Sequence, residues 1–193
     1  MKKFLFLLLI LQDLLIANGK VKSGSHEIDL YQLEFIRTNY YASVENEYLI
    51  GVIERFIERH FSSDKEKYPN LILAYVAALE SVKSKHAFWP HTKLEYFNKS
   101  MDLFKKVINN EPNSLEIRFL RFAILHHIPS FLGYSEERRE DAEYITKLLL
   151  KKDYSSINEE IQQGIAEFMY KSKRLSSSQE KLLLKNFALA SND

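Results

Sequence analysis

The sequence contains no cysteine, which excludes disulfides, thiolate metal sites and cysteine nucleophiles. Its 193 residues include only five glycines and four prolines, too few for collagen-like chains, flexible linker proteins or most turn-rich β-architectures. The chain also has no large excess of one charge, because it contains 27 basic and 26 acidic residues. We therefore expect no nucleic-acid partner. Aromatic residues are plentiful, with 13 Phe, 11 Tyr and one Trp, so the chain has enough apolar area to fold.

Residues 1–19 have the pattern of a secretory signal peptide. The first residues are basic, an unbroken apolar run covers residues 4–11, and small side chains precede a possible cleavage site ahead of Lys20. The apolar run is shorter than the roughly 20 residues that span a bilayer. The alternatives are an uncleaved anchor or a first helix packed on the core. Export without disulfides fits a bacterial envelope, so we expect a periplasmic or secreted protein.

The rest of the chain is predicted to be helical. After a polar stretch over residues 20–27, apolar residues recur with the spacing of amphipathic helices, as around Phe104, and no segment shows sustained strand-like alternation. We therefore predict an all-α fold of stacked antiparallel helical hairpins, a single domain over residues 28–191. About eight helices are expected, at residues 28–42, 44–61, 70–87, 92–110, 114–128, 136–151, 157–173 and 179–189.

A weak internal repeat is visible in the middle of the chain. The pair Pro69-Asn70 recurs 43 residues later as Pro112-Asn113, a period typical of helical solenoids. Four residues of the intervening segment resemble the second half of a tetratricopeptide motif, namely Ser100, Phe104, Val107 and Pro112. The first half of that motif is not matched. The resemblance covers about residues 70–151 and implies a tetratricopeptide-like α-solenoid.

A second resemblance rests on three short motifs. They are Pro112-Asn113, residues 116–119 together with Arg121, and the connector at residues 129–134. These motifs resemble a family of short exported bacterial helical proteins. The resemblance implies a helical fold and export, and it implies no particular chemistry.

The predicted helix at residues 114–128 is apolar on almost every side, so we expect it at the centre of the fold. Arg118 and Arg121 lie three residues apart on its single polar stripe. Guanidinium groups on a buried helix must be paired with acids or open onto a groove. Candidate acids on flanking helices are Glu80, Glu95 and Asp141. In the other arrangement, the two arginines line a groove and clamp the carboxylate of a partner, which makes them candidate binding residues.

The connector at residues 129–134 is unusually apolar for a solvated loop, and Gly133 can adopt a positive φ there. We expect Phe131, Leu132 and Tyr134 to pack under the core. An exposed connector would instead form a docking patch, so Phe131 and Tyr134 are also candidate binding residues.

No catalytic or metal-binding pattern stands out, and we predict no catalytic residue, metal or cofactor. Neighbouring His126 and His127 point about 100° apart on a helix and cannot face one ion together. His86 and His91 flank one connector and would converge if it folds back, but structural or solvent-exposed roles are favoured for both. The sequence favours an exported non-enzymatic protein- or peptide-binding or scaffold module, whose membrane contact is limited to the signal peptide before cleavage. The alternative is a small envelope enzyme that acts on a glycan or small molecule through carboxylates on neighbouring helices.

Overall fold

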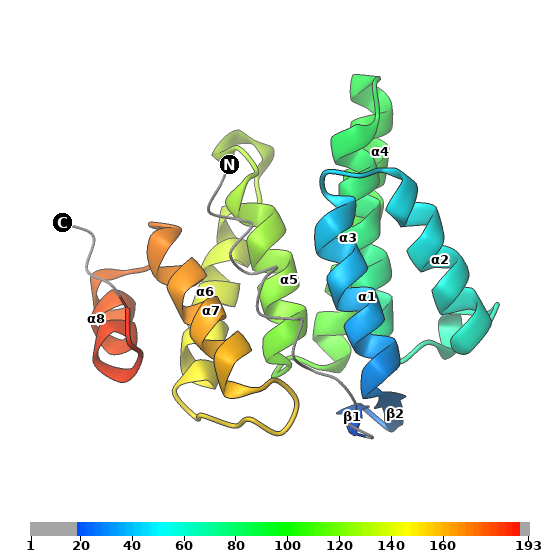
Figure 1. Cartoon of the computed structure of the whole chain (residues 1–193). Coiled ribbons are helices and arrows are strands. Elements are labelled where there is room, and N and C mark those ends of the chain that lie inside the picture. The colour runs from blue at the N-terminus through cyan, green and yellow to red at the C-terminus, as the bar shows by residue number, and fades with distance from the viewer. Residues whose placement is uncertain (1–18, 190–193) are drawn as a thin grey trace. The chain divides into compact units, whose positions relative to one another are not determined.

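A computed structural model describes residues 19–189 and confirms the mainly all-α fold class (Figure 1). The signal-peptide prediction falls on residues 1–19 and, apart from Gly19, lies outside the described residues. The chain forms two compact units that divide between Glu111 and Pro112, and each is described by itself below. The division falls inside the interval 70–151 that we expected to be most repeat-like, and a solenoid arrangement of the hairpins stays a prediction.

Eight α-helices lie within the described residues, and each begins and ends within four residues of a predicted helix. The first unit contains α1 (Leu30–Ser43), α2 (Tyr48–His60), α3 (Asn70–His86) and α4 (Pro90–Asn110). The second unit contains α5 (Leu115–His126), α6 (Ser135–Leu149), α7 (Glu159–Lys171) and α8 (Ser177–Asn186). Short 3-10 turns lie at η3 (Lys65–Lys67) and η4 (Ser130–Leu132). Within residues 19–189 no helix combines the length and the apolarity that crossing a bilayer would require.

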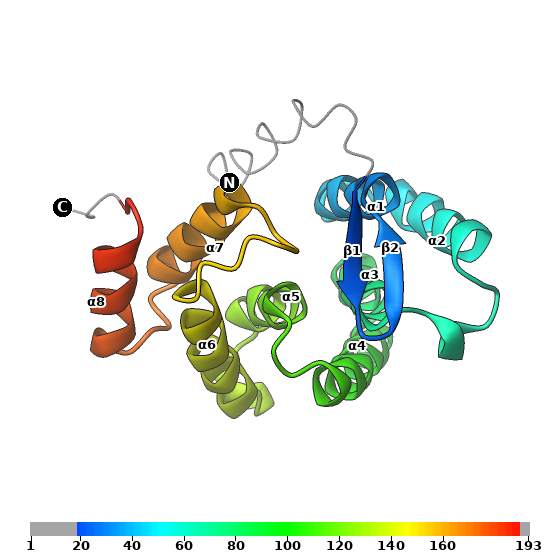
Figure 2. The same cartoon turned by 90° about the horizontal axis from the view of Figure 1, so that it is seen from below.

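The first unit opens with an antiparallel β-hairpin that the sequence analysis did not predict. Strands β1 (Lys20–Ser23) and β2 (His26–Asp29) are joined by a two-residue turn (Figure 2), in which Gly24 has φ +58°. Val21 pairs with Ile28, and both side chains are buried. Asp29 then caps α1, because its carboxylate accepts a hydrogen bond from the Gln32 N–H.

Helix α3 is the centre of the first unit. It packs against α4 as an antiparallel hairpin and also contacts α1 and α2. Every side chain from Leu71 to Glu80 is buried, which explains why this segment is apolar around the whole helix. On the facing helix, Phe104 is fully buried, as its place in the apolar stripe predicted.

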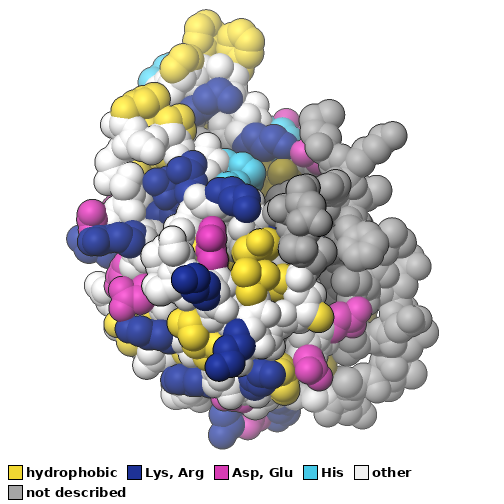
Figure 3. Space-filling model, turned by 90° about the vertical axis from the view of Figure 1, so that its left-hand side faces the viewer, with side chains coloured by type: hydrophobic (Ala, Val, Ile, Leu, Met, Phe, Trp, Pro, Cys, Tyr) yellow, Lys and Arg dark blue, Asp and Glu magenta, His cyan; other side chains and the backbone are white. Residues whose placement is uncertain are grey.

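The connector between α3 and α4 ends in exposed aromatic side chains. Phe88 is 82% exposed, Trp89 is exposed beside it, and their rings meet edge to face with centroids 5.0 Å apart. Pro90 then occupies the first turn of α4, where a missing N–H costs nothing. Figure 1 draws this connector at the upper end of the first unit, and Figure 3 shows hydrophobic side chains at the upper edge of its view. An aromatic tip of this kind was not predicted from the sequence.

The second unit is built around the α5–α6 pair, and α6 also contacts α7 and α8. Ser114 caps α5 by accepting the Ile117 N–H, and Asn158 caps α7 in the same way. Ser176 and Gln179 form a capping box at the start of α8. The core joins side chains of all four helices with one residue before α7 and one after α8, namely Phe119, Phe122, Ala142, Ile145, Leu149, Ile157, Ile165, Ala166, Met169, Leu183 and Phe187.

Candidate functional site

Arg118 and Arg121 lie on α5 below its cap, and the rest of that helix is packed into the second unit. Arg118 is among the largest fully buried side chains of the described chain, with 1% of its surface exposed, and Arg121 is buried as well. Spacing of three residues places both side chains on the face of α5 that meets α6. A carboxylate partner from α6 is therefore within reach of both.

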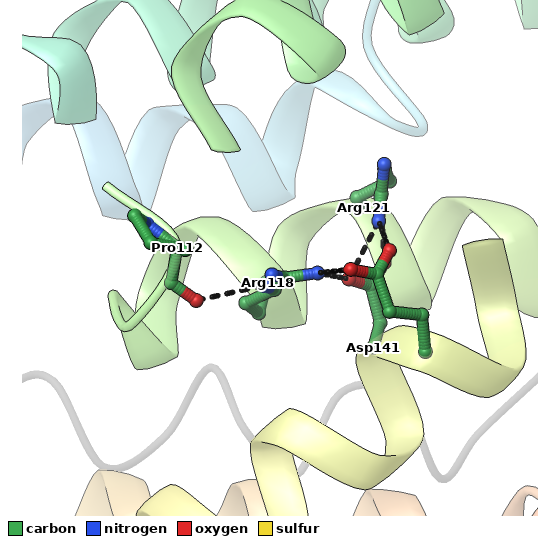
Figure 4. A network of polar contacts seen from close by, with 5 residues as sticks. Pro112, Arg118, Arg121 and Asp141 are labelled. Atoms are coloured by element: carbon green, nitrogen blue, oxygen red, sulfur yellow. Dashed lines mark hydrogen bonds and ion pairs between the residues drawn. The ribbon is translucent and has the colours of Figure 1, made fainter. Parts of the chain in front are cut away.

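That partner is Asp141, which is fully buried on α6. Arg118 Nη1 donates a hydrogen bond of 2.9 Å to Asp141 Oδ1 (Figure 4). Arg121 binds the same carboxylate with two donors, from Nε to Oδ2 at 2.7 Å and from Nη2 to Oδ1 at 2.8 Å. This two-donor geometry is the strongest that an arginine and a carboxylate form, so Asp141 holds both guanidinium groups in place.

Further groups complete the surroundings of the two arginines. Glu140 lies at the solvent edge and forms ion pairs of 3.2 Å with Arg118 and with Arg121. Arg118 Nε donates to the Pro112 carbonyl oxygen at 3.0 Å, and its guanidinium lies 4.0 Å from the centre of the Tyr144 ring. Two cations are thus balanced by two anions within one unit.

The pKa values of the buried partners show how burial and pairing compete in this network. Burial acts to lower the pKa of Arg121, but hydrogen bonds to Asp141 and the charges of Asp141 and Glu140 raise that pKa overall. Burial raises the pKa of Asp141, and the two guanidinium groups oppose that shift. The structure therefore shows the paired arrangement, with Asp141 as the partner of both arginines.

The other two candidate acids lie in the first unit. Glu80 is buried on α3 and forms ion pairs with Lys83 and Lys99. Glu95 lies on the exposed side of α4. Sequence separation and polarity could not distinguish these acids from Asp141, because only the packing of α5 on α6 selects the partner.

The connector between α5 and α6 is exposed, so the expectation that Phe131 and Leu132 pack under the core is wrong. Phe131 is 86% exposed, Leu132 is exposed, and Tyr134 is half-buried at the start of α6. The backbone of the connector is nevertheless held by hydrogen bonds, from Leu132 N–H to the Pro129 carbonyl and from Gly133 N–H to that of Ser130. Gly133 takes φ +88°, which favours glycine there. This ordered turn presents Phe131 to solvent.

The histidines are dispersed and take part in separate contacts. His86 Nε2 lies 3.0 Å from the Ser43 carbonyl oxygen, whereas the His91 ring stacks near Trp89. His126 and His127 meet edge to face with centroids 4.7 Å apart. No group of three or more His, Asp or Glu residues within residues 19–189 is placed to hold a metal ion.

Comparison with known proteins adds no relative: no protein-family model, curated protein or solved structure matches this chain. The two resemblances found in the sequence therefore stay predictions.

Proposed function

We propose that this protein is an exported, non-enzymatic protein- or peptide-binding module that docks its partner on the connector between α5 and α6. The observation that carries the proposal is Phe131, which is 86% exposed on a turn with a hydrogen-bonded backbone. Leu132 extends the apolar surface beside it. Aromatic residues are enriched in the cores of protein interfaces, and a turn that is already ordered loses little conformational entropy on binding.

The chemistry of the partner follows from the chemistry of the connector. Phe131 offers an apolar ring, so the partner surface should be an apolar pocket or a hydrophobic side chain. The alternative of an envelope enzyme has less support, because the neighbouring carboxylates of Glu140 and Asp141 are both engaged by arginines. A catalytic carboxylate pair would need freedom to exchange protons with a substrate.

The docking proposal is tested by capturing partners with the purified exported protein and with two variants. Phe131→Ser should reduce capture of a specific envelope protein about tenfold or more while leaving the melting temperature unchanged. Phe88→Ser is the matched control, because Phe88 is an equally exposed phenylalanine on a different connector. Equal capture by the wild type and the Phe131 variant would refute docking on this connector. Loss of capture only in the Phe88 variant would place the docking site on the connector between α3 and α4.

Export is tested separately by the intact mass of the protein recovered outside the cytoplasm. A signal peptide over residues 1–19 predicts a mature N-terminus near Lys20, the first residue of β1. A membrane-associated species that still carries Met1 would contradict this proposal and favour an uncleaved anchor.

A further inference from the structure

A buried arginine of α6, Arg138, lies against the C-terminal end of α5 and has no carboxylate partner among the described residues. Four arginines of the described chain are buried: Arg37, Arg118, Arg121 and Arg138. The first three form ion pairs with carboxylates, Arg37 with Glu34 and the other two with Asp141. Arg138, with 9% of its surface exposed, forms none with any residue between 19 and 189. Burying a guanidinium without an anion is costly, so the surroundings of Arg138 need an explanation.

A second arginine lies at the same place. Arg138 Nη1 donates to the Leu125 carbonyl oxygen at 3.1 Å, and Arg174 Nη2 lies 3.5 Å from the next carbonyl oxygen, that of His126. Consecutive carbonyls at the end of one helix therefore bring the two guanidinium groups together from different elements, α6 and the connector before α8. Ser135 Oγ, at 3.4 Å, is a further neutral acceptor for Arg138.

The charge of this cluster is not balanced by the described residues. Burial and the charge of Arg174 lower the pKa of Arg138, and burial together with His127, Arg174 and Arg138 lowers that of His126. The C-terminal dipole of α5 supplies about half a negative charge against two guanidinium groups. The positive charge that remains is close to what one oxyanion would neutralise.

The acids of α6 nearest in sequence do not fill this role. Glu136 pairs with Arg139 on the exposed side of the helix. Glu137 forms no ion pair with Arg138 or Arg174, and its Oε2 is buried without a hydrogen-bond partner.

We propose that Arg138 and Arg174 form a binding site for a phosphate-type oxyanion at the C-terminal end of α5, beside His126. Two guanidinium forks that come from different elements supply donors in several directions, which suits a tetrahedral anion with three or four acceptor oxygens. His126 lies close enough to feel the charges of both arginines, so an anion bound between them would also act on its imidazole. This site goes beyond the docking function proposed above, because it needs no protein partner.

The test uses the purified exported protein and inorganic phosphate at constant ionic strength, with chloride as the balancing anion. Arginine Nε–Hε NMR signals should shift saturably as phosphate is added. Arg174→Gln should weaken the apparent affinity about tenfold, since Arg174 is exposed and its replacement leaves the core untouched. Arg139→Gln is the matched control on the next residue after Arg138, and it should bind phosphate like the wild type.

A second experiment distinguishes a free oxyanion from one that belongs to a lipid headgroup. The same three proteins are mixed with vesicles of phosphatidylglycerol or of phosphatidylcholine. The site is assigned to a lipid headgroup if the protein binds only phosphatidylglycerol vesicles, and if this binding is lost in Arg174→Gln and competed by free phosphate. A saturable NMR shift with phosphate but no vesicle binding would assign the site to a free anion. The proposal is overturned if phosphate causes no saturable shift and neither vesicle binds, or if Arg174→Gln behaves like the wild type.

Discussion

Both units bury charge on their central helix, and they neutralise it in different ways. In the first unit, Glu80 on α3 is 1% exposed and receives the ammonium groups of Lys83 at 3.2 Å and Lys99 at 2.9 Å. Both lysines keep contact with solvent, and Lys83 also reaches Glu54. In the second unit, two arginines and Asp141 are all buried, and only Glu140 meets water.

This difference predicts how each unit responds when its ion pair is damaged. A lysine ammonium sits on a flexible stem and can return to water when its partner is lost. A guanidinium fork that is locked inside the unit has no such alternative, so removing one member leaves a buried charge without its partner. The network around Asp141 should therefore contribute more to stability than the one around Glu80.

The largest expected effect comes from Arg118→Met. It leaves Asp141 with one guanidinium and removes the hydrogen bond to Pro112, so we expect a loss of about 3–5 kcal/mol in the free energy of unfolding. Arg139→Met is the control on an exposed arginine and should change stability by less than about 0.5 kcal/mol. Chemical denaturation measures both, and hydrogen exchange should place the loss in α5 and α6. Near-equal denaturation midpoints of the two variants would instead favour a role of Arg118 in binding.

A loss of stability of comparable size is expected from a change in the apolar core of the first unit. Phe104→Ala should cost about 3–5 kcal/mol, because Phe104 is fully buried on α4, the helix that packs against α3, and truncation leaves a cavity. Lys105→Ala, one residue further and exposed, should cost less than about 0.5 kcal/mol. Denaturation midpoints of the two variants give the comparison. Similar midpoints would mean that Phe104 contributes little to the packing of this unit.

How much the sequence could predict depended on whether a feature is periodic. The helices and the burial of Phe104 follow from spacing along one chain segment, and both predictions are confirmed. Phe131 was predicted wrongly because a connector of six residues has no period that distinguishes an inward from an outward ring. The hairpin around Gly24 was missed because its four-residue strands show too little alternation, although Gly-Ser is a known two-residue turn.

The partner of the arginines could not be chosen from sequence for a different reason. Asp141 lies 20 residues beyond Arg121, on the next helix, and only the register between α5 and α6 selects it over other acids. The cluster of Arg138 and Arg174 was missed in the same way, because its members come from α6 and from a connector 36 residues later that happen to meet one helix end. Such contacts depend on tertiary packing.

A smaller effect is expected from Glu80→Gln in the first unit. The substitution keeps the shape of the side chain and removes its charge, while Lys83 retains Glu54 and Lys99 remains open to water. We expect a loss of about 1–2 kcal/mol, below that of Arg118→Met. Denaturation of the two variants side by side gives the ranking. If Glu80→Gln were as damaging as Arg118→Met, solvent access of the cation would not be what separates the two units.

The smallest effect, a pH dependence, should be confined to the second unit. Burial lowers the pKa of His126 below its ordinary value of 6.5, assisted by the charges of His127, Arg174 and Arg138. The unfolded chain then binds more protons than the folded one just below pH 6.5, so stability falls as the pH drops through that value and is regained above it. His126→Gln should make the melting temperatures at pH 5.5 and pH 7.5 differ less than they do in the wild type. Hydrogen exchange in α5 and α6 should follow the same trend while α3 and α4 stay unchanged, and an identical pH profile in wild type and variant would show that His126 does not couple protons to the stability of this unit.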